Sequence, residues 1–205
     1  MNKEKQVYQL GESLLNKEDK ILKKCPELIY EKSGYVDVKI RDDLLMFHPE
    51  VVLYCPQIPQ NTGSIARLCA AFSTTLHLIE PMPFQITEKA VRRAGLDYWE
   101  HVNLFIHKNF AEFKKVRTQR RLIFIETGGN QTPYEFQFEP GDLIVFGAET
   151  FGIPEYIMDE EIQKGAHKLT IPMFNRGVRS INLANTVSIV LYLAVAQLHG
   201  SKKRE

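Results

Sequence analysis

The sequence predicts an α/β fold in which a parallel sheet carries helices on both of its faces. Two observations support this prediction. From residue 51 onward, short apolar runs alternate with segments in which apolar residues recur at helical spacing. The short runs are almost continuous in apolar residues, as expected for strands that are buried on both faces.

The elements can be placed in chain order. We expect strands at residues 51–54, 76–79, 102–106, 122–125, 143–146 and 169–171. We expect helices at residues 62–72, 87–94, 110–116 and 183–200, with Asn61 or Thr62 capping the first and Gly200 ending the last. Pro81 and Pro172 mark where the second and the last strand stop.

The first 49 residues differ from the rest of the chain. They hold nine basic and nine acidic residues, so this segment is dense in charge but neutral. A short amphipathic helix is expected around residues 14–22 and an edge strand around 36–40. We therefore divide the chain into an N-terminal extension without recognisable chemistry (1–49), a main domain (50–200) and a basic tail (201–205).

Composition narrows the classes of function. Among the 205 residues, 26 are Lys or Arg and 25 are Asp or Glu, which gives a formal charge of +1. That balance excludes an indiscriminate polycation, so nucleic-acid binding would need a local basic patch. Neither a long apolar run nor an apolar leader occurs, so we expect a cytoplasmic protein that is neither exported nor membrane-spanning. Three scattered cysteines without a CxxC pattern predict reduced thiols and no metal site.

Three polar, glycine-bearing segments follow three of the predicted strands. They span residues 61–67, 147–154 and 172–185. Ligands of an open parallel sheet collect at the carboxyl ends of its strands, so we expect these segments to converge there. Such loops expose main-chain donors and acceptors, which suits a small polar cofactor.

Several common nucleotide and hydrolase motifs are missing from these segments. No GxGxxG follows a predicted strand, and no GxSxG elbow occurs. Gly147 and Gly152 have the GxxxxG spacing of a P-loop, but Ile153 and Pro154 stand where the lysine and the hydroxyl residue belong. Dinucleotide binding, P-loop chemistry and serine hydrolysis are therefore disfavoured.

The three segments in this order resemble the motifs of the SPOUT (SpoU–TrmD) methyltransferases, specifically the SpoU-like enzymes that methylate ribose 2′-hydroxyls in RNA. The first motif is carried by Asn61, Gly63 and Arg67; the second by Gly147, Ala148, Glu149, Gly152 and Pro154; the third by Ile171, Pro172, Ser180, Asn182 and Asn185. Segments 53–59, 79–82 and 92–98 are similar to those of the tRNA (cytidine/uridine-34-2′-O)-methyltransferases. The resemblance covers roughly residues 50–200.

The resemblance implies a fold, a reaction and partners. The implied fold ends in a C-terminal trefoil knot, and the implied assembly is a homodimer that shares catalytic groups across its interface. The implied reaction is transfer of a methyl group from S-adenosyl-L-methionine to a ribose of the tRNA anticodon loop. A ribosomal RNA 2′-O-methyltransferase, or an RNA-binding protein that kept the fold without catalysis, remain as alternatives.

The resemblance also implies roles for individual residues. The cofactor positions are Ile125, Gly147, Gly152, Ile171 and Ser180, and the catalytic positions are Arg67, Ser180 and Asn182. The RNA-contacting positions are Asn61, Arg92, Arg93, Arg176 and Arg179, while Glu149 would support the second loop. Arg67 would orient the ribose oxygen or stabilise its developing charge, because a guanidinium that stays protonated is a poor general base.

Each of these residues also has a purely structural interpretation. The glycines could be turn residues, the isoleucines core residues, and Ser180 the N-cap of the last helix. Tyr98 and Trp99 could stack on bases or belong to the core. Phe151 departs from the family, which often carries Arg or Lys there; because an apolar ring cannot contact phosphate, RNA binding is expected to differ at this position.

Overall fold

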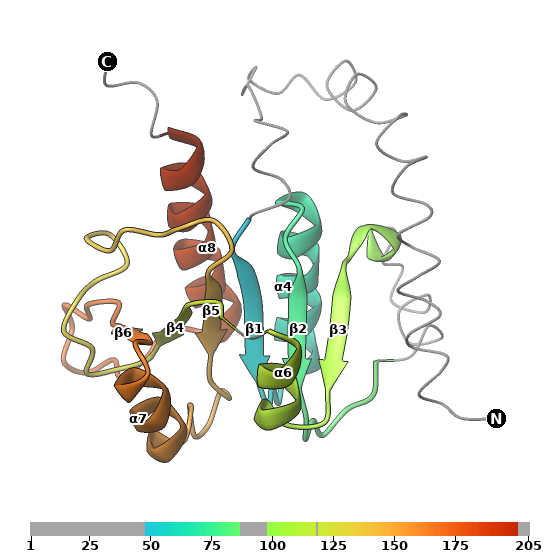
Figure 1. Ribbon diagram of the computed structural model, residues 1–205, viewed down its shortest axis with the longest axis horizontal. Coiled ribbons are helices and arrows are strands. Elements are labelled where there is room, and N and C mark those ends of the chain that lie inside the picture. The colour runs from blue at the N-terminus through green and yellow to red at the C-terminus, as the bar shows by residue number, and fades with distance from the viewer. Residues whose placement is uncertain (1–47, 87–97, 118, 201–205) are drawn as a thin grey trace. The chain divides into compact units, whose positions relative to one another are not determined.

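A computed structural model describes residues 48–86, 98–117 and 119–200. Its centre is a six-stranded sheet with the strand order β3-β2-β1-β5-β4-β6, and every neighbouring pair of strands is parallel (Figure 1). The prediction of a parallel α/β sheet is therefore confirmed. Because all strands point the same way, their carboxyl ends share one edge, where the loops of the three predicted motifs begin.

The strands are β1 (Glu50–Tyr54), β2 (Leu76–Ile79), β3 (Leu104–His107), β4 (Leu122–Ile125), β5 (Leu143–Phe146) and β6 (His167–Leu169). The helices are α4 (Pro59–Ala71), α6 (Phe110–Val116), α7 (Glu155–Gln163) and α8 (Leu183–Gly200), with a short 3-10 helix, η1 (Trp99–His101). None of the helices in the described part of the chain is long and apolar enough to cross a membrane.

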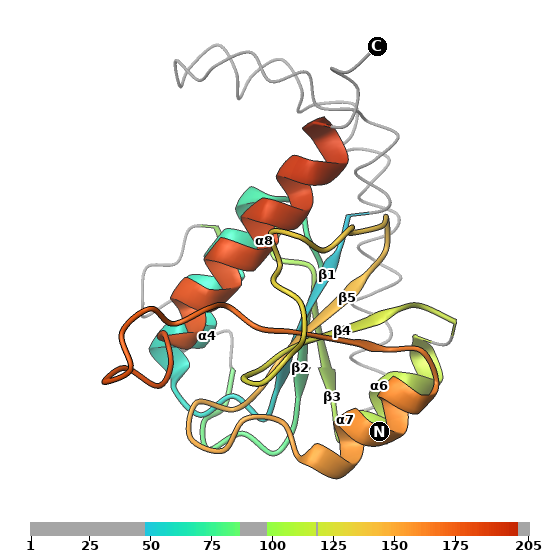
Figure 2. The ribbon, with the colours of Figure 1, turned by 90° about the vertical axis from the view of Figure 1, so that its left-hand side faces the viewer.

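Helices cover both faces of the sheet, and the strands alternate their side chains between them. Helices α4 and α8 lie together on one face, and α6 and α7 lie on the other (Figures 1 and 2). In β5, for example, Ile144 and Phe146 belong to the core on the α4/α8 side, whereas Leu143 and Val145 belong to the core on the α6/α7 side. Burial on both faces explains why these strands are continuous apolar runs.

Several predicted boundaries match the structure, and others do not. The predicted strands 76–79, 122–125 and 143–146 and the helix 110–116 coincide with β2, β4, β5 and α6. The predicted cap of α4 by Asn61 or Thr62 is wrong: the helix begins at Pro59, whose fixed φ suits the first turn and whose missing N–H needs no partner there. Helix α7, which follows Pro154, was not predicted at all.

The last strand also ends earlier than predicted. Residues 167–169 pair with β4, but Thr170 leaves the ladder, and its N–H binds the carbonyl of Gln131 instead. Ile171 lies beyond the strand and packs, half-buried, against the core on the α4/α8 side. The predicted extension, the helix at 87–94, Arg92 and Arg93, and the tail at 201–205 lie outside the described residues, apart from residues 48 and 49 of the extension.

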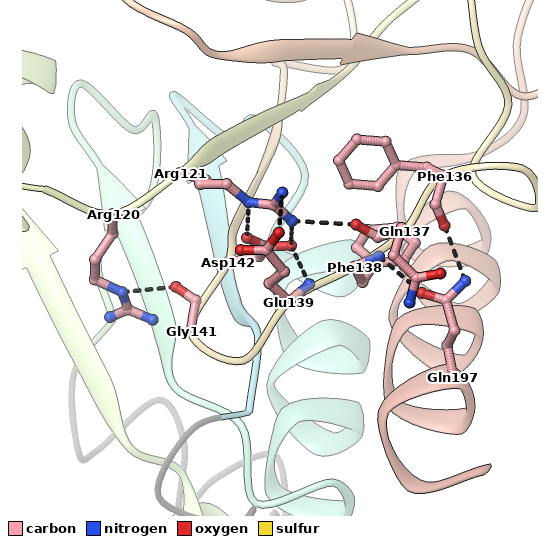
Figure 3. A network of polar contacts seen from close by, with 9 residues as sticks. All are labelled: Arg120, Arg121, Phe136, Gln137, Phe138, Glu139, Gly141, Asp142 and Gln197. Atoms are coloured by element: carbon pink, nitrogen blue, oxygen red, sulfur yellow. Dashed lines mark hydrogen bonds and ion pairs between the residues drawn. The ribbon is translucent and has the colours of Figure 1, made fainter. Parts of the chain in front are cut away.

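The start of β5 is anchored by a polar network (Figure 3). Asp142 is 2% exposed, and both of its carboxylate oxygens accept hydrogen bonds from Arg121 at 2.8 Å. Hydrogen bonding to Asp142 raises the pKa of Arg121, so this guanidinium stays protonated. Earlier in the connection between β4 and β5, the side-chain amide of Gln197, a residue of α8, accepts from the Phe138 N–H at 2.7 Å and donates to the Phe136 carbonyl at 2.9 Å. The β4–β5 connection is thus fastened to α8.

Candidate functional site

Three loops leave the carboxyl edge of the sheet close to one another. We call residues 55–58 loop 1, residues 147–154 loop 2 and residues 170–182 loop 3; they follow β1, β5 and β6. Strands β1 and β5 are neighbours, and β6 follows one strand farther on, beyond β4. The topology therefore brings the three motifs found in the sequence to one side of the molecule.

Glu149 joins loop 2 to loop 1. Its carboxylate accepts from the backbone N–H groups of Gln57 at 2.8 Å and Ile58 at 3.2 Å, and from the side-chain amide of Asn61 at 2.9 Å. The two backbone donors lie just before α4, where helix geometry leaves N–H groups without partners. One carboxylate thus takes the place of a helix cap and fixes the spacing of the two loops.

Asn182 joins loop 3 to the same point. Its side-chain Nδ2 donates to Asn61 Oδ1 at 3.0 Å, while its Oδ1 accepts from the N–H of Ala184 at 2.9 Å. Asn182 is therefore the residue that caps α8, the role that the structural interpretation had given to Ser180. Asn61 is buried between Glu149 and Asn182, so the three predicted residues form one hydrogen-bonded chain that links loop 2, the first turn of α4 and loop 3.

Loop 2 is closed on itself around its two glycines. Ala148 and Gly152 exchange backbone hydrogen bonds of 3.1 and 2.9 Å, and Gly152 has a φ of +68°. A Cβ at Gly147 would lie 2.4 Å from the Gly152 carbonyl carbon, and one at Gly152 would lie 2.4 Å from Glu126 Oε2. Glycine avoids these close contacts at both positions, and at Gly152 it also fits the left-handed backbone.

The end of β4 lies between loops 2 and 3. Ile125 is in register with Phe146 of β5 on one side and Leu169 of β6 on the other, and it is 7% exposed. The next residue, Glu126, accepts from the Ile153 N–H of loop 2 at 3.3 Å, and its carbonyl accepts from the Thr170 hydroxyl at 2.6 Å. Sequence reasoning missed Glu126 and Thr170, since neither belongs to a recognised motif.

Arg67 lies apart from these contacts, on the exposed side of α4. Its guanidinium carbon is 4.6 Å from the centre of the Tyr98 ring, a cation–π arrangement, and the Tyr98 hydroxyl donates to the Gly63 carbonyl at 3.0 Å. Six residues of helix, or about 9 Å of rise, separate Arg67 from Asn61. Trp99 packs against the core, so the structural interpretation applies to this ring.

The remaining predicted residues of loop 3 are exposed. Ser180, Arg176 and Arg179 all face solvent, and so do two apolar neighbours, Phe174 (96% exposed) and Val178. The structure leaves the basic side chains free to meet an anion or an RNA strand, but it does not bring them against Glu149 or Asn61. A segment with this composition is typical of a surface that is completed by a partner.

A second feature at this edge was not predicted from the sequence. A cavity of about 290 Å³ opens beside loops 1 and 2, and its lining residues are Cys55, Gln57, Pro81, Met82, Pro83 and Phe151. Burial raises the pKa of the Cys55 thiol, so this side chain is neutral at physiological pH. Among the described residues, no group of three or more His, Cys, Asp or Glu side chains could hold a metal ion.

The chemistry that this edge supports follows from its parts. Loops 2 and 3 offer main-chain donors and acceptors beside apolar surface from Ile125 and Ile171, an environment suited to a planar, polar cofactor. Glu149, Asn61 and Asn182 hold the loops in place through their hydrogen bonds. Fold and loops together define a class: a parallel α/β protein whose polar loops gather at the carboxyl edge of its sheet, where proteins of this class bind their ligands.

Comparison with known proteins gives the family. The model of the SpoU rRNA Methylase family matches residues 48–192, so the chain belongs to the SpoU methylase family. A tRNA (cytidine(34)-2′-O)-methyltransferase of Escherichia coli strain K12 is 42% identical over 148 residues, covering 72% of this chain and 92% of that protein. The enzyme of the same name from Methylovorus glucosotrophus strain SIP3-4 is 40% identical over 148 residues, covering 72% and 94%.

A solved structure agrees with these relatives. A protein studied for 2-OH methylation of C/U34 on tRNA superposes with a TM-score of 0.67 at 41% sequence identity, covering 75% of this chain and 98% of its own. The matched region is the part of the chain that resembled the SpoU-like enzymes in sequence. The recognition of the family from three short motifs is therefore confirmed.

Proposed function

We propose that this chain is an S-adenosylmethionine-dependent methyltransferase that modifies the ribose 2′-hydroxyl of the tRNA wobble nucleotide. The observation that carries the proposal is the hydrogen-bonded chain Glu149–Asn61–Asn182, which holds the three family motifs in one place. Two relatives named for this reaction support the proposal, because the chain aligns with 92% and 94% of their own lengths.

The donor set at this edge fits S-adenosylmethionine. Ile125 and Ile171 would contact its apolar parts, and the main chain around Gly147, Gly152 and Ser180 would bind its polar edges. When bound, this cofactor supplies an activated methyl group on a good leaving group. The protein then has to align the 2′-oxygen with that methyl group and help the hydroxyl proton to leave.

Arg67 would act on the ribose oxygen. A guanidinium can donate to the oxygen and stabilise the negative charge that develops as the proton leaves, which is a task for a fixed cation rather than for a base. The Tyr98 ring restricts where this side chain can point. Arg176 and Arg179, exposed in loop 3, would bind phosphates on the same strand of RNA.

Two further family properties are proposed with this function. The first is a homodimer: α8 exposes Ile189 and Tyr192 and loop 3 exposes Phe174, and a second copy would cover this apolar surface. The second is the trefoil knot. Its support comes from two contacts of the connection between β4 and β5. Gly129 and Gln131 of this connection bind Thr170, where the chain leaves β6. Phe136 of the same connection accepts a hydrogen bond from Gln197 of α8.

The test is methyl transfer to defined RNA. Purified protein with labelled cofactor should methylate a tRNA anticodon stem-loop, and the same RNA with 2′-deoxyribose at the target should stay unlabelled. Nucleoside mass spectrometry of tRNA from cells with and without the gene would identify the nucleotide. Label on a base would overturn the reaction, label on ribosomal RNA alone would overturn the substrate, and RNA binding without any transfer would indicate a non-catalytic protein.

A further inference from the structure

Phe151 gives the carboxyl edge a feature that the proposed reaction does not use. It lies in loop 2, between Glu149 and Gly152, and 57% of the residue is exposed. Yet it is not an isolated apolar side chain, because it forms part of the lining of the 290 Å³ cavity beside loop 1. The turn after β2, with Pro81, Met82 and Pro83, forms another part of this lining.

The lining determines what the cavity can hold. All six lining residues are uncharged, since the side chains are those of prolines, a methionine, a phenylalanine, a glutamine and a neutral thiol. A phosphate would be poorly bound here, because burying it without a cation is unfavourable. The volume lies just below the usual range for drug-sized ligands, so a single flat ring system is a better match than a dinucleotide.

Gln57 adds a polar group of known orientation. Its Oε1 accepts from both the N–H and the hydroxyl of Thr150 in loop 2, at 3.2 and 2.5 Å. Within the described part of the chain its Nε2 has no partner, so two N–H donors are left for a ligand. Carbonyl oxygens and ring nitrogens on the edge of a nucleobase are acceptors for such donors.

We propose that this cavity takes one unpaired nucleobase of the substrate RNA, with Phe151 as its stacking surface and Gln57 as the donor to its edge. This inference rests on the proposed function, since it assigns the base-binding part of the same site. Aromatic rings bind bases of single-stranded RNA by stacking, and loops present such bases unpaired.

The position of the cavity would make base binding useful for the reaction. Loop 2 carries Phe151 and also Glu149, which binds Gln57 and Asn61 through the hydrogen bonds described above. A base seated against Phe151 would therefore lie on the loop that Glu149 joins to loop 1 and to Asn61. Holding the base limits where the attached ribose can lie, and this positioning is what in-line methyl transfer requires.

The experiment uses full-length protein and anticodon stem-loops in which 5-iodouridine replaces each loop nucleotide in turn. Irradiation should crosslink one of these RNAs to Phe151, as located by peptide mass spectrometry. Phe151→Leu, which keeps an apolar side chain but removes the ring, should lose this crosslink. It should also raise KM for the RNA about tenfold while leaving kcat little changed.

Tyr156→Leu is the matched control. Tyr156 is an exposed aromatic residue of α7 (71% exposed), and it does not line the cavity. Its loss should change neither the crosslink nor KM. Both Phe151→Leu and this variant alter exposed side chains, so both should melt near the temperature of the parent protein.

The outcomes separate this inference from the proposed function. Crosslinking and equilibrium binding of the stem-loop are measured without cofactor, so they report on the cavity even if no methyl transfer is found. A crosslink to Phe151 that disappears in Phe151→Leu supports base binding. Crosslinks confined to other regions, or an RNA affinity equal in Phe151→Leu and the parent, would overturn the inference while leaving ribose methylation intact.

Discussion

Asn61 and Asn182 are 121 positions apart in the chain, yet the amide of Asn182 donates to the side-chain oxygen of Asn61 at 3.0 Å. The contact joins the first turn of α4 to the residue that caps α8, and these two helices cover one face of the sheet. Since Glu149 binds the other end of the Asn61 side chain, Asn61 connects loop 2 to loop 3.

Replacing Asn182 should separate folding from catalysis. Asn182→Ala removes the cap of α8 and should lower the free energy of unfolding in urea by about 1 kcal/mol. Asn182→Asp keeps the cap, because its carboxylate can still accept from Ala184, but it places negative charge against Asn61 Oδ1. We expect Asn182→Asp to stay nearly as stable as the parent and to lose most of its methyl transfer. Equal activity in Asn182→Asp and the parent would remove the Asn61–Asn182 contact from the mechanism.

Gly152→Ala should destabilise loop 2 by more than the backbone strain of its positive φ alone. An added Cβ would meet Glu126 Oε2 at 2.4 Å, whereas at Gly165, where φ is +100°, nothing lies within 4 Å. Gly165→Ala is therefore the control, with an expected loss of about 1 kcal/mol from backbone strain alone. Gly152→Ala should lose more stability than this and should weaken cofactor binding, as measured by calorimetry. Similar losses of stability in the two variants would show that the Glu126 side chain can move away from an added Cβ at little cost in free energy.

Acid should destabilise the protein through His77 and His107, whose rings contact Phe113 of α6. Burial lowers the pKa of His107 from 6.5 to about 4, and burial also lowers the pKa of His77. The unfolded chain then binds more protons than the folded one between pH 6.5 and 4, so stability falls as the pH falls through this window. For His107 alone we expect a loss on the order of 2 kcal/mol in urea unfolding between these pH values.

The variant His107→Gln checks this assignment. His77 Nε2 lies 2.7 Å from the Glu50 carboxylate, whose pKa is about 2 because His77 and Arg120 outweigh the opposing effect of burial. An ionised carboxylate only accepts, so His77 donates to it and accepts from His107 through its other nitrogen, 3.0 Å away. Glutamine can make this donation without titrating. The slope of stability against pH should therefore become shallower, and an unchanged slope would assign it to other groups.

Arg67→Ala should keep cofactor affinity and lose about a hundredfold in turnover, the effect expected when one donor to a developing charge is removed. Tyr98→Phe is the matched variant, because it keeps the ring against which the guanidinium lies 4.6 Å from the centre. It should retain most of the activity. Single-turnover kinetics with saturating cofactor measures both, and a near-normal rate in Arg67→Ala would remove this residue from the reaction.

The parts of the fold that follow from composition were predictable from the sequence. Strands β2, β4 and β5 were placed to the residue because each is a short apolar run buried on both faces. Boundaries set by tertiary hydrogen bonds were not predictable. Thr170 looks like a strand residue, but its backbone and hydroxyl bind Gln131 and Glu126 instead. Helix α7 was missed because its buried residues, Ile157, Met158 and Glu161, include a carboxylate.

The candidate site was predictable only as far as its motifs reach. The motifs placed Gly147, Glu149, Asn61 and Asn182 in one site, but they could not show that Asn61 accepts from one loop and donates to another. Gln57 and Glu126 belong to no recognised motif, so the sequence did not predict them as site residues. The structure shows their hydrogen bonds with Thr150 and Ile153, which are far away in the chain. The contact of Arg67 was likewise not predictable from the sequence, because its partner Tyr98 is 31 positions away in the chain and close to it only in the folded protein.

The salt bridge between Arg121 and buried Asp142 lies at the amino ends of β4 and β5, opposite the edge that carries the motif loops. The contacts that fix the start of these strands therefore lie away from those that hold the motif loops. A substitution that weakens the Arg121–Asp142 pair should lower stability without altering the hydrogen bonds of Glu149, Asn61 and Asn182.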